Sequence, residues 1–129
     1  MTQAVLLDTH ILLWLRLAPE RLTGGERRAI DAAPCRYVSA VSLWEIAILI
    51  GLGRIADDPR LFDLPRGLAL LPIGPAHCRE LLTLPALHKD PFDRMLIAQA
   101  RADSLLLITR DDKITAYGRA GAATANLVQ

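Results

Sequence analysis

Two acidic side chains stand in apolar surroundings where a bare charge is unfavourable. Asp8 is the only charged residue among the first 15, and Glu45 is the only one in residues 37–53. Carboxylates are rarely buried unless a partner compensates their charge. Neither stretch contains a Lys or an Arg, so the compensating charge must come from a distant segment or from a bound cation.

Two acids from the second half of the chain can join this pair. Asp93 shares one face of a predicted helix with Ile97 and Ala100, so we expect it to point toward the packed side. Asp111 directly follows an apolar stretch, and its neighbour Asp112 leaves the assignment of the fourth acid open.

Most of these acids also have a purely structural interpretation. Asp8 and Asp111 stand where helix N-caps occur, Asp93 lies in a first helical turn, and Asp90 just before it suits an N-cap or a solvated position. Glu45 lies in mid-helix and caps nothing, so it is either paired with a distant Arg or part of a site. Four acids from four separate segments together favour a shared site.

A cluster of carboxylates favours a divalent cation. Unit charges about 4 Å apart repel by roughly 4 kcal/mol at an effective dielectric constant near 20, and a cation relieves this repulsion. Oxygen ligands select Mg²⁺ or Mn²⁺, whereas His10, His77 and His88 are scattered and lack the HxxxH spacing of a zinc site. Acidic sites of this kind act on phosphate esters, where the metal activates a water and stabilises the leaving oxygen.

Apolar runs and helical periodicity alternate along the chain, which predicts the elements that must position these acids. The predicted strands are 4–8, 37–40, 68–73 and 105–109, and the predicted helices are 9–17, 23–33, 42–53, 75–84, 91–104 and 111–118. Residues 57–67 look irregular, and the tail to Gln129 suits a last edge strand. The alternation predicts a three-layer α/β/α domain with a mostly parallel sheet, whose sites lie beyond the carboxyl ends of the strands.

Composition is consistent with one ordinary globular domain spanning residues 1–129. Hydrophobic residues make up 52% of the 129, and the net charge is +1, so the composition shows no gross electrostatic commitment to nucleic acid. Cys35 and Cys78 are too few and too far apart for a disulfide scaffold. No signal peptide or membrane span is predicted, and we expect a cytoplasmic protein.

Four segments resemble, in order and spacing, the PIN-domain ribonucleases, specifically the VapC-type toxins of bacterial toxin–antitoxin pairs. The segments are LLDTHILLW, VSAVSLWEIAI, HKDPFDRMLIAQA and LLLITRD, and the resemblance covers about residues 4–118. The family's metal-binding acids fall on Asp8, Glu45, Asp93 and Asp111. The segment AGAATANLVQ matches the family's usual final strand poorly.

The resemblance implies a Mg²⁺- or Mn²⁺-dependent endoribonuclease that acts as a toxin, forms a homodimer and is blocked by a VapB-like antitoxin. It implies that Thr9 and Thr109 are hydroxyls supporting the site and that Asp90 is an accessory residue. The candidate RNA contacts are Lys89, Arg94 and Arg110. The apolar surfaces at Leu12–Leu17 and Leu43–Leu52 could form the groove for an antitoxin peptide, although core packing is the role we favour for most of these residues.

Two other classes remain open from the residues alone. A phosphatase-like α/β domain shares an Asp at the end of the first strand, but a dehalogenase-like phosphatase needs an Asp where His10 stands. A receiver domain needs a Lys after a late strand, and Lys113 is misplaced for that role. In a non-catalytic interaction module the acids would serve only as helix caps. The isolation of Glu45 in mid-helix argues against this class.

Overall fold

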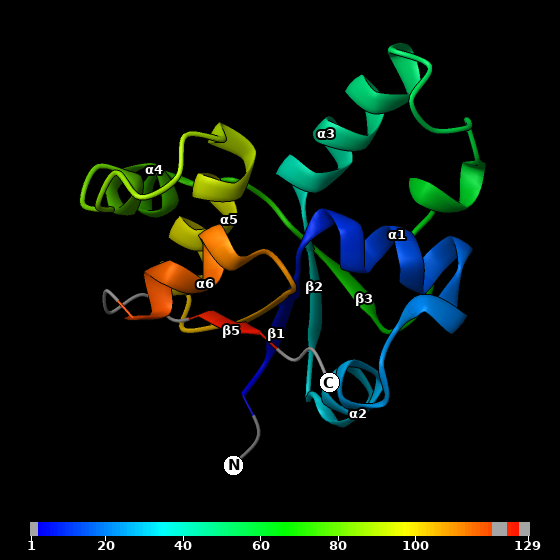
Figure 1. Ribbon diagram of the computed structural model, residues 1–129, viewed down its shortest axis with the longest axis horizontal. Coiled ribbons are helices and arrows are strands. Elements are labelled where there is room, and N and C mark those ends of the chain that lie inside the picture. Colours follow the sequence, from blue (N-terminus) through cyan, green and yellow to red (C-terminus); the bar gives the residue numbers. More distant parts are fainter. Residues whose placement is uncertain (1–2, 120–123, 127–129) are drawn as a thin grey trace.

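The computed structural model describes residues 3–119 and 124–126, and within them a single five-stranded sheet forms the centre (Figure 1). Its strands are β1 (Val5–Leu7), β2 (Arg36–Ser39), β3 (Leu68–Leu71), β4 (Leu106–Thr109) and β5 (Thr124–Asn126). Their order is β3-β2-β1-β4-β5, and every neighbouring pair is parallel. The prediction of a mostly parallel sheet is confirmed.

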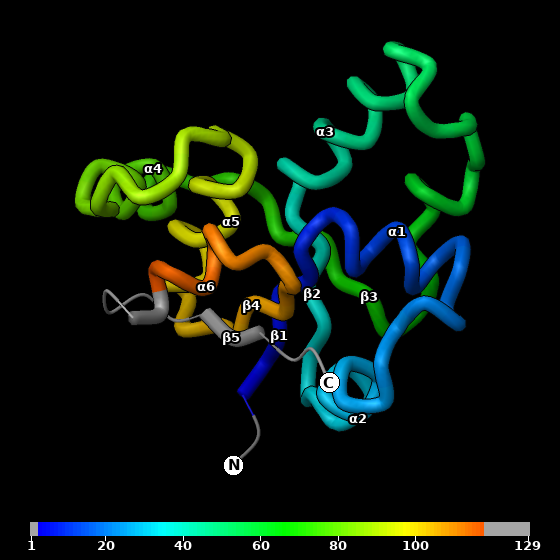
Figure 2. The backbone as a smooth tube through the Cα atoms, viewed as in Figure 1, coloured from blue at the N-terminus to red at the C-terminus, as the bar shows by residue number. Residues whose placement is uncertain are grey.

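Helices cover both faces of this sheet. They are α1 (Thr9–Leu17), α2 (Gly24–Ala32), α3 (Ala40–Gly51), α4 (Pro75–Leu81), α5 (Pro91–Ala102) and α6 (Asp112–Arg119), with short 3-10 turns η1 (Pro19–Arg21) and η2 (Pro59–Leu61). Helices α4, α5 and α6 lie on one side of the sheet, and α1 and α2 lie on the other (Figures 1 and 2).

Alternating side chains of the central strands build a separate core on each face. Leu6 and Leu107 pack with Ile97 of α5, and Val5 and Ile108 pack in a cluster with side chains of α1 and α2. Both clusters are buried, as expected when strands alternate their side chains between two covered faces. These cores fix the strand ends from which the acids project.

The chain forms these elements close to the predicted positions. Thr23 and Glu26 make the predicted capping box at the start of α2, with reciprocal hydrogen bonds of 3.1 and 2.8 Å. Helix α3 begins earlier than predicted, because the Ser39 hydroxyl accepts a hydrogen bond from the Val41 N–H and caps the helix at the end of β2. The predicted edge strand in the tail is present as β5, and the rest of the tail lies outside the described residues.

Helix α3 is apolar on all sides but is not covered on all sides. Val41 and Ile46 face the core, whereas Trp44, Ile48 and Leu52 are 60%, 38% and 62% exposed. Even so, no helix in the described part of the chain is both long and apolar enough to span a membrane.

Candidate metal centre

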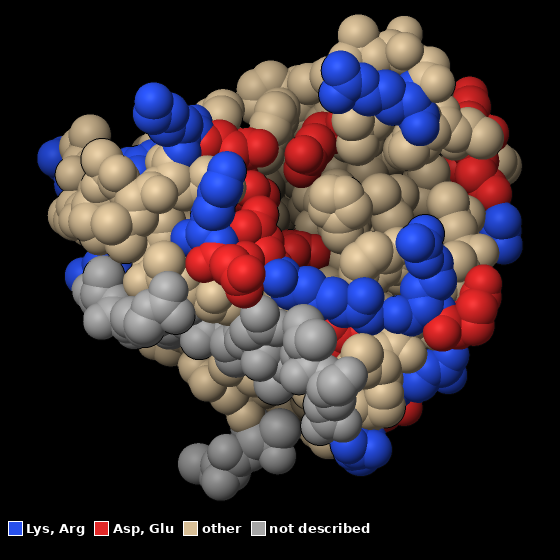
Figure 3. Space-filling model, in the orientation of Figure 1, with Lys and Arg blue, Asp and Glu red and all other residues tan. Residues whose placement is uncertain are grey.

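A pocket of about 420 Å³ opens beyond the carboxyl ends of β1 and β4, the edge at which the sequence predicts a site. The acidic residues that line it are Asp8, Glu45, Asp90, Asp93 and Asp111. Figure 3 shows acidic side chains gathered around a hollow on this face, with basic side chains at its edge. All four predicted acids therefore come together, and Asp90 joins them.

Asp8 holds the first helix and lines the pocket at the same time. Its Oδ1 accepts a hydrogen bond from the Ile11 N–H at 2.9 Å, which makes it the N-cap of α1. Its Oδ2 accepts a 2.5 Å hydrogen bond from the Thr109 hydroxyl at the end of β4. Burial is the largest influence on this carboxyl and raises its pKa, although both hydrogen bonds favour the charged form.

Glu45 faces the same pocket from the middle of α3. Its Oε1 accepts a 2.7 Å hydrogen bond from the Thr9 hydroxyl, which also lies 3.0 Å from the Ser42 oxygen. In the described part of the chain, no Lys or Arg is within ion-pair distance of Glu45. Burial raises the pKa of Glu45, and the negative charges of Asp90 and Asp8 add to the rise. Pairing with a distant Arg is therefore not the explanation for this acid.

Asp93 projects into the pocket from the first turn of α5, as its helical phase predicts. Asp90 caps that helix, because its Oδ1 accepts hydrogen bonds from the N–H groups of Phe92 and Asp93 at 2.8 and 3.3 Å. Burial raises the pKa of Asp93 to about 6, with Asp90 and Asp111 adding to the rise and His88 opposing it.

Of the two candidates for the fourth acid, Asp111 lines the pocket, whereas Asp112 is exposed in the first turn of α6 and does not line it. Asp111 is positioned by two local hydrogen bonds. Its N–H donates to the Thr109 oxygen at 3.0 Å, and its Oδ1 accepts from the Lys113 N–H at 2.8 Å. The hydroxyls of Thr9 and Thr109 thus both contact acids of the site.

His88 is the site residue that the sequence reasoning missed. Its Nε2 lies 2.8 Å from Oδ2 of Asp93 and 4.0 Å from Oδ2 of Asp111. One ligand atom from each of these three residues falls within 4.8 Å of the others, close enough to share a cation. The expectation that all three histidines are scattered is wrong for His88 and also for His10, which lines the same pocket. The position of His88 just before the DPFD segment was the only available signal.

The three basic residues predicted to contact RNA occupy different places. Arg110 lines the pocket, but its guanidinium binds the buried Glu26 through Nε at 2.6 Å and Nη2 at 2.5 Å, and it stacks on Trp14 at 4.3 Å. Arg94 and Lys89 do not line the pocket. Lys113, which the sequence reasoning did not select, does line it. The RNA contacts of Lys89, Arg94 and Arg110 stay predictions.

The donors that meet here fit a divalent cation. Three carboxyls, those of Asp8, Glu45 and Asp93, have pKa values raised by burial, so the protein alone leaves their charge under-compensated. Of the basic side chains at the pocket, Arg110 is already paired with Glu26. Carboxylate oxygens are the ligands that Mg²⁺ and Mn²⁺ prefer.

Comparison with known proteins identifies the family of this chain. The family model "PIN domain" matches residues 5–120. Ribonuclease VapC22 of Mycobacterium tuberculosis is 30% identical over 118 residues, which is 88% of this chain and 91% of the relative.

Solved structures share the fold at lower identity. VapBC2 from Rickettsia felis bound to a promoter DNA fragment has a TM-score of 0.72 at 13% identity, covering 97% of this chain and 99% of the other. VapC20 of Mycobacterium tuberculosis, described as a sarcin-ricin-loop-cleaving toxin, has a TM-score of 0.64 at 16% identity, covering 88% and 95%. The chain therefore belongs to the PIN-domain family and, within it, to the VapC-type proteins.

Proposed function

We propose that this protein is a divalent-cation-dependent endoribonuclease that acts as the toxin of a toxin–antitoxin pair. The observation that carries the proposal is the convergence of acids from separate segments at one sheet edge, with burial raising the pKa of three of them. The name of the 30% identical relative, a ribonuclease, supports the activity. The solved VapBC structures support an antitoxin as partner.

In this proposal Asp8, Glu45 and Asp93 hold Mg²⁺ or Mn²⁺, and Asp111 completes the site or a second, weaker one. A bound cation of this kind supplies a Lewis acid for the phosphodiester and makes water acidic enough to act as a nucleophile. The chain's own contribution is orientation. Thr9 holds Glu45 through a 2.7 Å hydrogen bond, and Asp8 is fixed from both sides by α1 and by Thr109.

Charge at the pocket edge fits a phosphate backbone. The guanidinium of Arg110 is largely committed to Glu26, whereas Lys113 is exposed and its side chain has no acidic partner among the described residues. An ammonium on a flexible stem binds phosphate as a point charge. We therefore place Lys113 first among the residues that contact RNA in the pocket.

A second concave surface fits the proposed antitoxin. It has a volume of about 420 Å³ and lies between α1 and the end of α3, where it is lined by Leu13, Trp14, Leu17, Leu49 and Ile55 among others. All of these side chains except Ile55 belong to the two apolar stretches, Leu12–Leu17 and Leu43–Leu52, that the resemblance associates with an antitoxin peptide. A homodimer is part of the same proposal, and the exposed side chains of Trp44 in α3 and of Leu52 just after it are apolar surface available for contacts between protein chains.

An RNA cleavage assay with purified protein tests the activity. We expect the wild type to cleave RNA with Mg²⁺ or Mn²⁺ and to stop when EDTA is added. Asp8→Asn should lower the rate at least about a hundredfold, because a metal centre supplies several kcal/mol of transition-state stabilisation. Asn is as good an N-cap as Asp, so the variant should keep its melting temperature and serve as a folded control.

The outcomes separate the alternatives. Cleavage that survives both EDTA and Asp8→Asn would refute the proposed centre. A wild type that binds no cation and cleaves no RNA would favour the interaction module. The phosphatase class is disfavoured by the site itself, because position 10 carries an exposed His10 where that chemistry needs an acid.

A further inference from the structure

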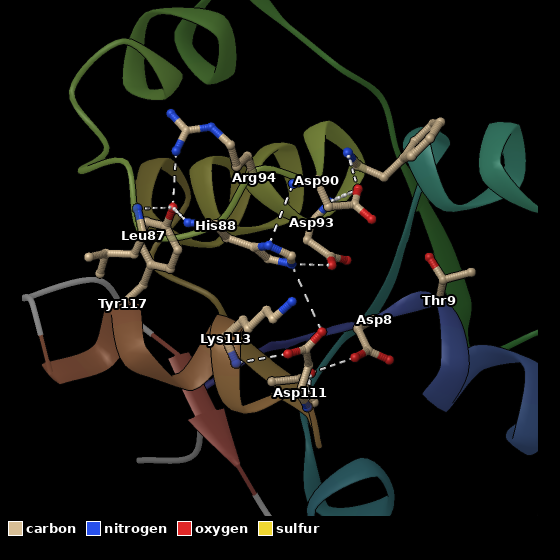
Figure 4. Close-up of polar contacts among 12 residues, drawn as sticks. Asp8, Thr9, Leu87, His88, Asp90, Asp93, Arg94, Asp111, Lys113 and Tyr117 are labelled. Atoms are coloured by element: carbon tan, nitrogen blue, oxygen red, sulfur yellow. Dashed lines mark hydrogen bonds and ion pairs between the residues drawn. The ribbon is translucent and has the colours of Figure 1, made fainter.

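His88 lies at the centre of the polar network on the α5 and α6 side of the pocket (Figure 4). The loop before α5 carries it, and its side chain is only 10% exposed. Its Nε2 is 2.8 Å from Oδ2 of Asp93, and the backbone N–H of Asp90 approaches its Nδ1 at 3.5 Å. The imidazole therefore sits between two neighbouring acids of the site.

The direction of the hydrogen bond follows from the partners. An ionised carboxylate only accepts hydrogen bonds, so Nε2 of His88 must carry the hydrogen that it gives to Asp93. The approach of the Asp90 N–H to Nδ1 agrees, because a neutral imidazole accepts at one nitrogen when it donates at the other. In this arrangement Oδ2 of Asp93 is occupied by His88. Oδ1 has no hydrogen-bond partner among the described residues.

The backbone that carries His88 is itself held from a distance. The N–H groups of Leu87 and His88 donate to the hydroxyl oxygen of Tyr117 at 3.2 and 3.0 Å. Tyr117 is fully buried in α6. Arg94 of α5 donates to the same oxygen at 3.0 Å and to the Pro85 carbonyl at 3.1 Å (Figure 4). These contacts fasten the loop to α5 and to α6.

We propose that His88 is a positioning residue of the metal centre. Its Nε2–H holds one oxygen of Asp93 and leaves the other for the cation, while the Tyr117–Arg94 contacts hold His88 in place. The inference rests on the proposed function, since it assigns a role toward the same cation. It also reassigns Arg94 from a predicted RNA contact to the support of this loop.

Mn²⁺ binding to the full-length protein, measured by calorimetry, tests this role without any need for RNA cleavage. We expect His88→Ala to weaken Mn²⁺ about 10- to 100-fold, the usual effect of losing a group that orients a metal ligand. His88→Gln should recover most of the loss, because its amide N–H can replace the donor. Tyr117→Phe should weaken binding in the same direction but less. Lys89→Gln is the matched control, because Lys89 is exposed on the same loop as His88 and does not line the pocket.

Spectroscopy separates a positioning residue from a ligand. Pulsed electron paramagnetic resonance of the Mn²⁺ protein detects a nitrogen that is directly bound to the metal. We expect no nitrogen coupling in the wild type that is lost in His88→Gln. A nitrogen coupling from His88, or an unchanged Mn²⁺ affinity in His88→Ala, would overturn the inference. Either result is distinguishable from failure of the proposed function, in which the wild type itself would bind no Mn²⁺.

Discussion

Three acids of the site each have two roles, capping a helix and lining the pocket. Asp8, Asp90 and Asp111 each accept a hydrogen bond from a backbone N–H at the start of a helix and also line the pocket. The cap and the ligand interpretations are therefore not alternatives, because a carboxylate has two oxygens and several lone pairs. Sequence position located these residues well, since a strand-to-helix junction is a local feature. It marked Asp90 only as an N-cap or a solvated residue, and the family resemblance added that it is an accessory residue.

The raised pKa of Asp93, about 6, predicts how the site depends on pH. The folded protein holds this proton more tightly than the unfolded chain. The contribution of Asp93 to stability is thus fully present below about pH 4 and is lost as the pH rises through about 6. A cation competes with the same proton, so Mn²⁺ affinity should fall about tenfold per pH unit below pH 6.

Calorimetric Mn²⁺ titrations at a series of pH values check this dependence. The pKa values of Asp8 and Glu45 are raised as well, so any further slope should have the same sign. An affinity that stays constant between about pH 5 and pH 7 would contradict the expected protonation of Asp93.

Two lysines give a matched test of which basic residue meets RNA. Lys113 lines the pocket, whereas Lys89 is exposed and does not. In an Asp8→Asn background that prevents cleavage, Lys113→Ala should weaken binding of single-stranded RNA and reduce the salt dependence by about one phosphate contact, a slope change of about 0.7. Lys89→Ala should change neither quantity. The reverse result would restore Lys89 as the contact.

The helices and strands themselves were largely predictable, because each is encoded by a pattern in its own stretch of sequence. Apolar runs marked β1 and β4, and the capping box marked the start of α2. The errors fall at element ends, as at α4, which stops at Leu81 where the sequence predicts a helix to residue 84. There the last residues form turns, with the Leu84 N–H bonded to the Leu81 carbonyl.

The ion pair between α2 and the residue after β4 could not be predicted from the sequence. Breaking it should lower the free energy of unfolding substantially. Glu26 is fully buried and pairs with Arg110, 84 residues away. Burial alone would raise the pKa of Glu26, but the Arg110 and Thr23 hydrogen bonds outweigh it and lower the value. Its contribution to stability is therefore present above about pH 4.5 and is lost as the pH falls.

Glu26→Gln isolates this ion pair, because Gln still completes the capping box with Thr23. We expect a loss of roughly 3 kcal/mol in the free energy of unfolding, the low end for breaking a buried pair, because the Arg110 side chain is 28% exposed. Urea unfolding at neutral pH measures it. Glu20→Gln, at an exposed position in η1, is the control, and an equal loss in both variants would contradict the importance of the pair.

The topology of the molecule follows from the sequence more securely than its side-chain network does. Strands that alternate with helices leave few arrangements besides a parallel sheet, and carboxyl ends of neighbouring strands then share an edge. That reasoning brought Asp8 and Asp111 together. The Tyr117 hydroxyl reaches His88 across 29 positions, and nothing in the local pattern around either residue encodes that contact.

Because the acids come from segments spread over the whole chain, a cation that binds them should stabilise the entire fold. At a Mn²⁺ concentration about 100 times the dissociation constant, linkage gives about 2.7 kcal/mol, which corresponds to a rise of roughly 10 °C in melting temperature for a chain of this length. Differential scanning fluorimetry in EDTA and in Mn²⁺ measures the rise. Glu45→Gln should lose most of it, since it removes a ligand without disturbing a cap, while Glu20→Gln should keep it. If Mn²⁺ did not change the melting temperature of the wild type, the clustered carboxylates would be held apart by the fold alone.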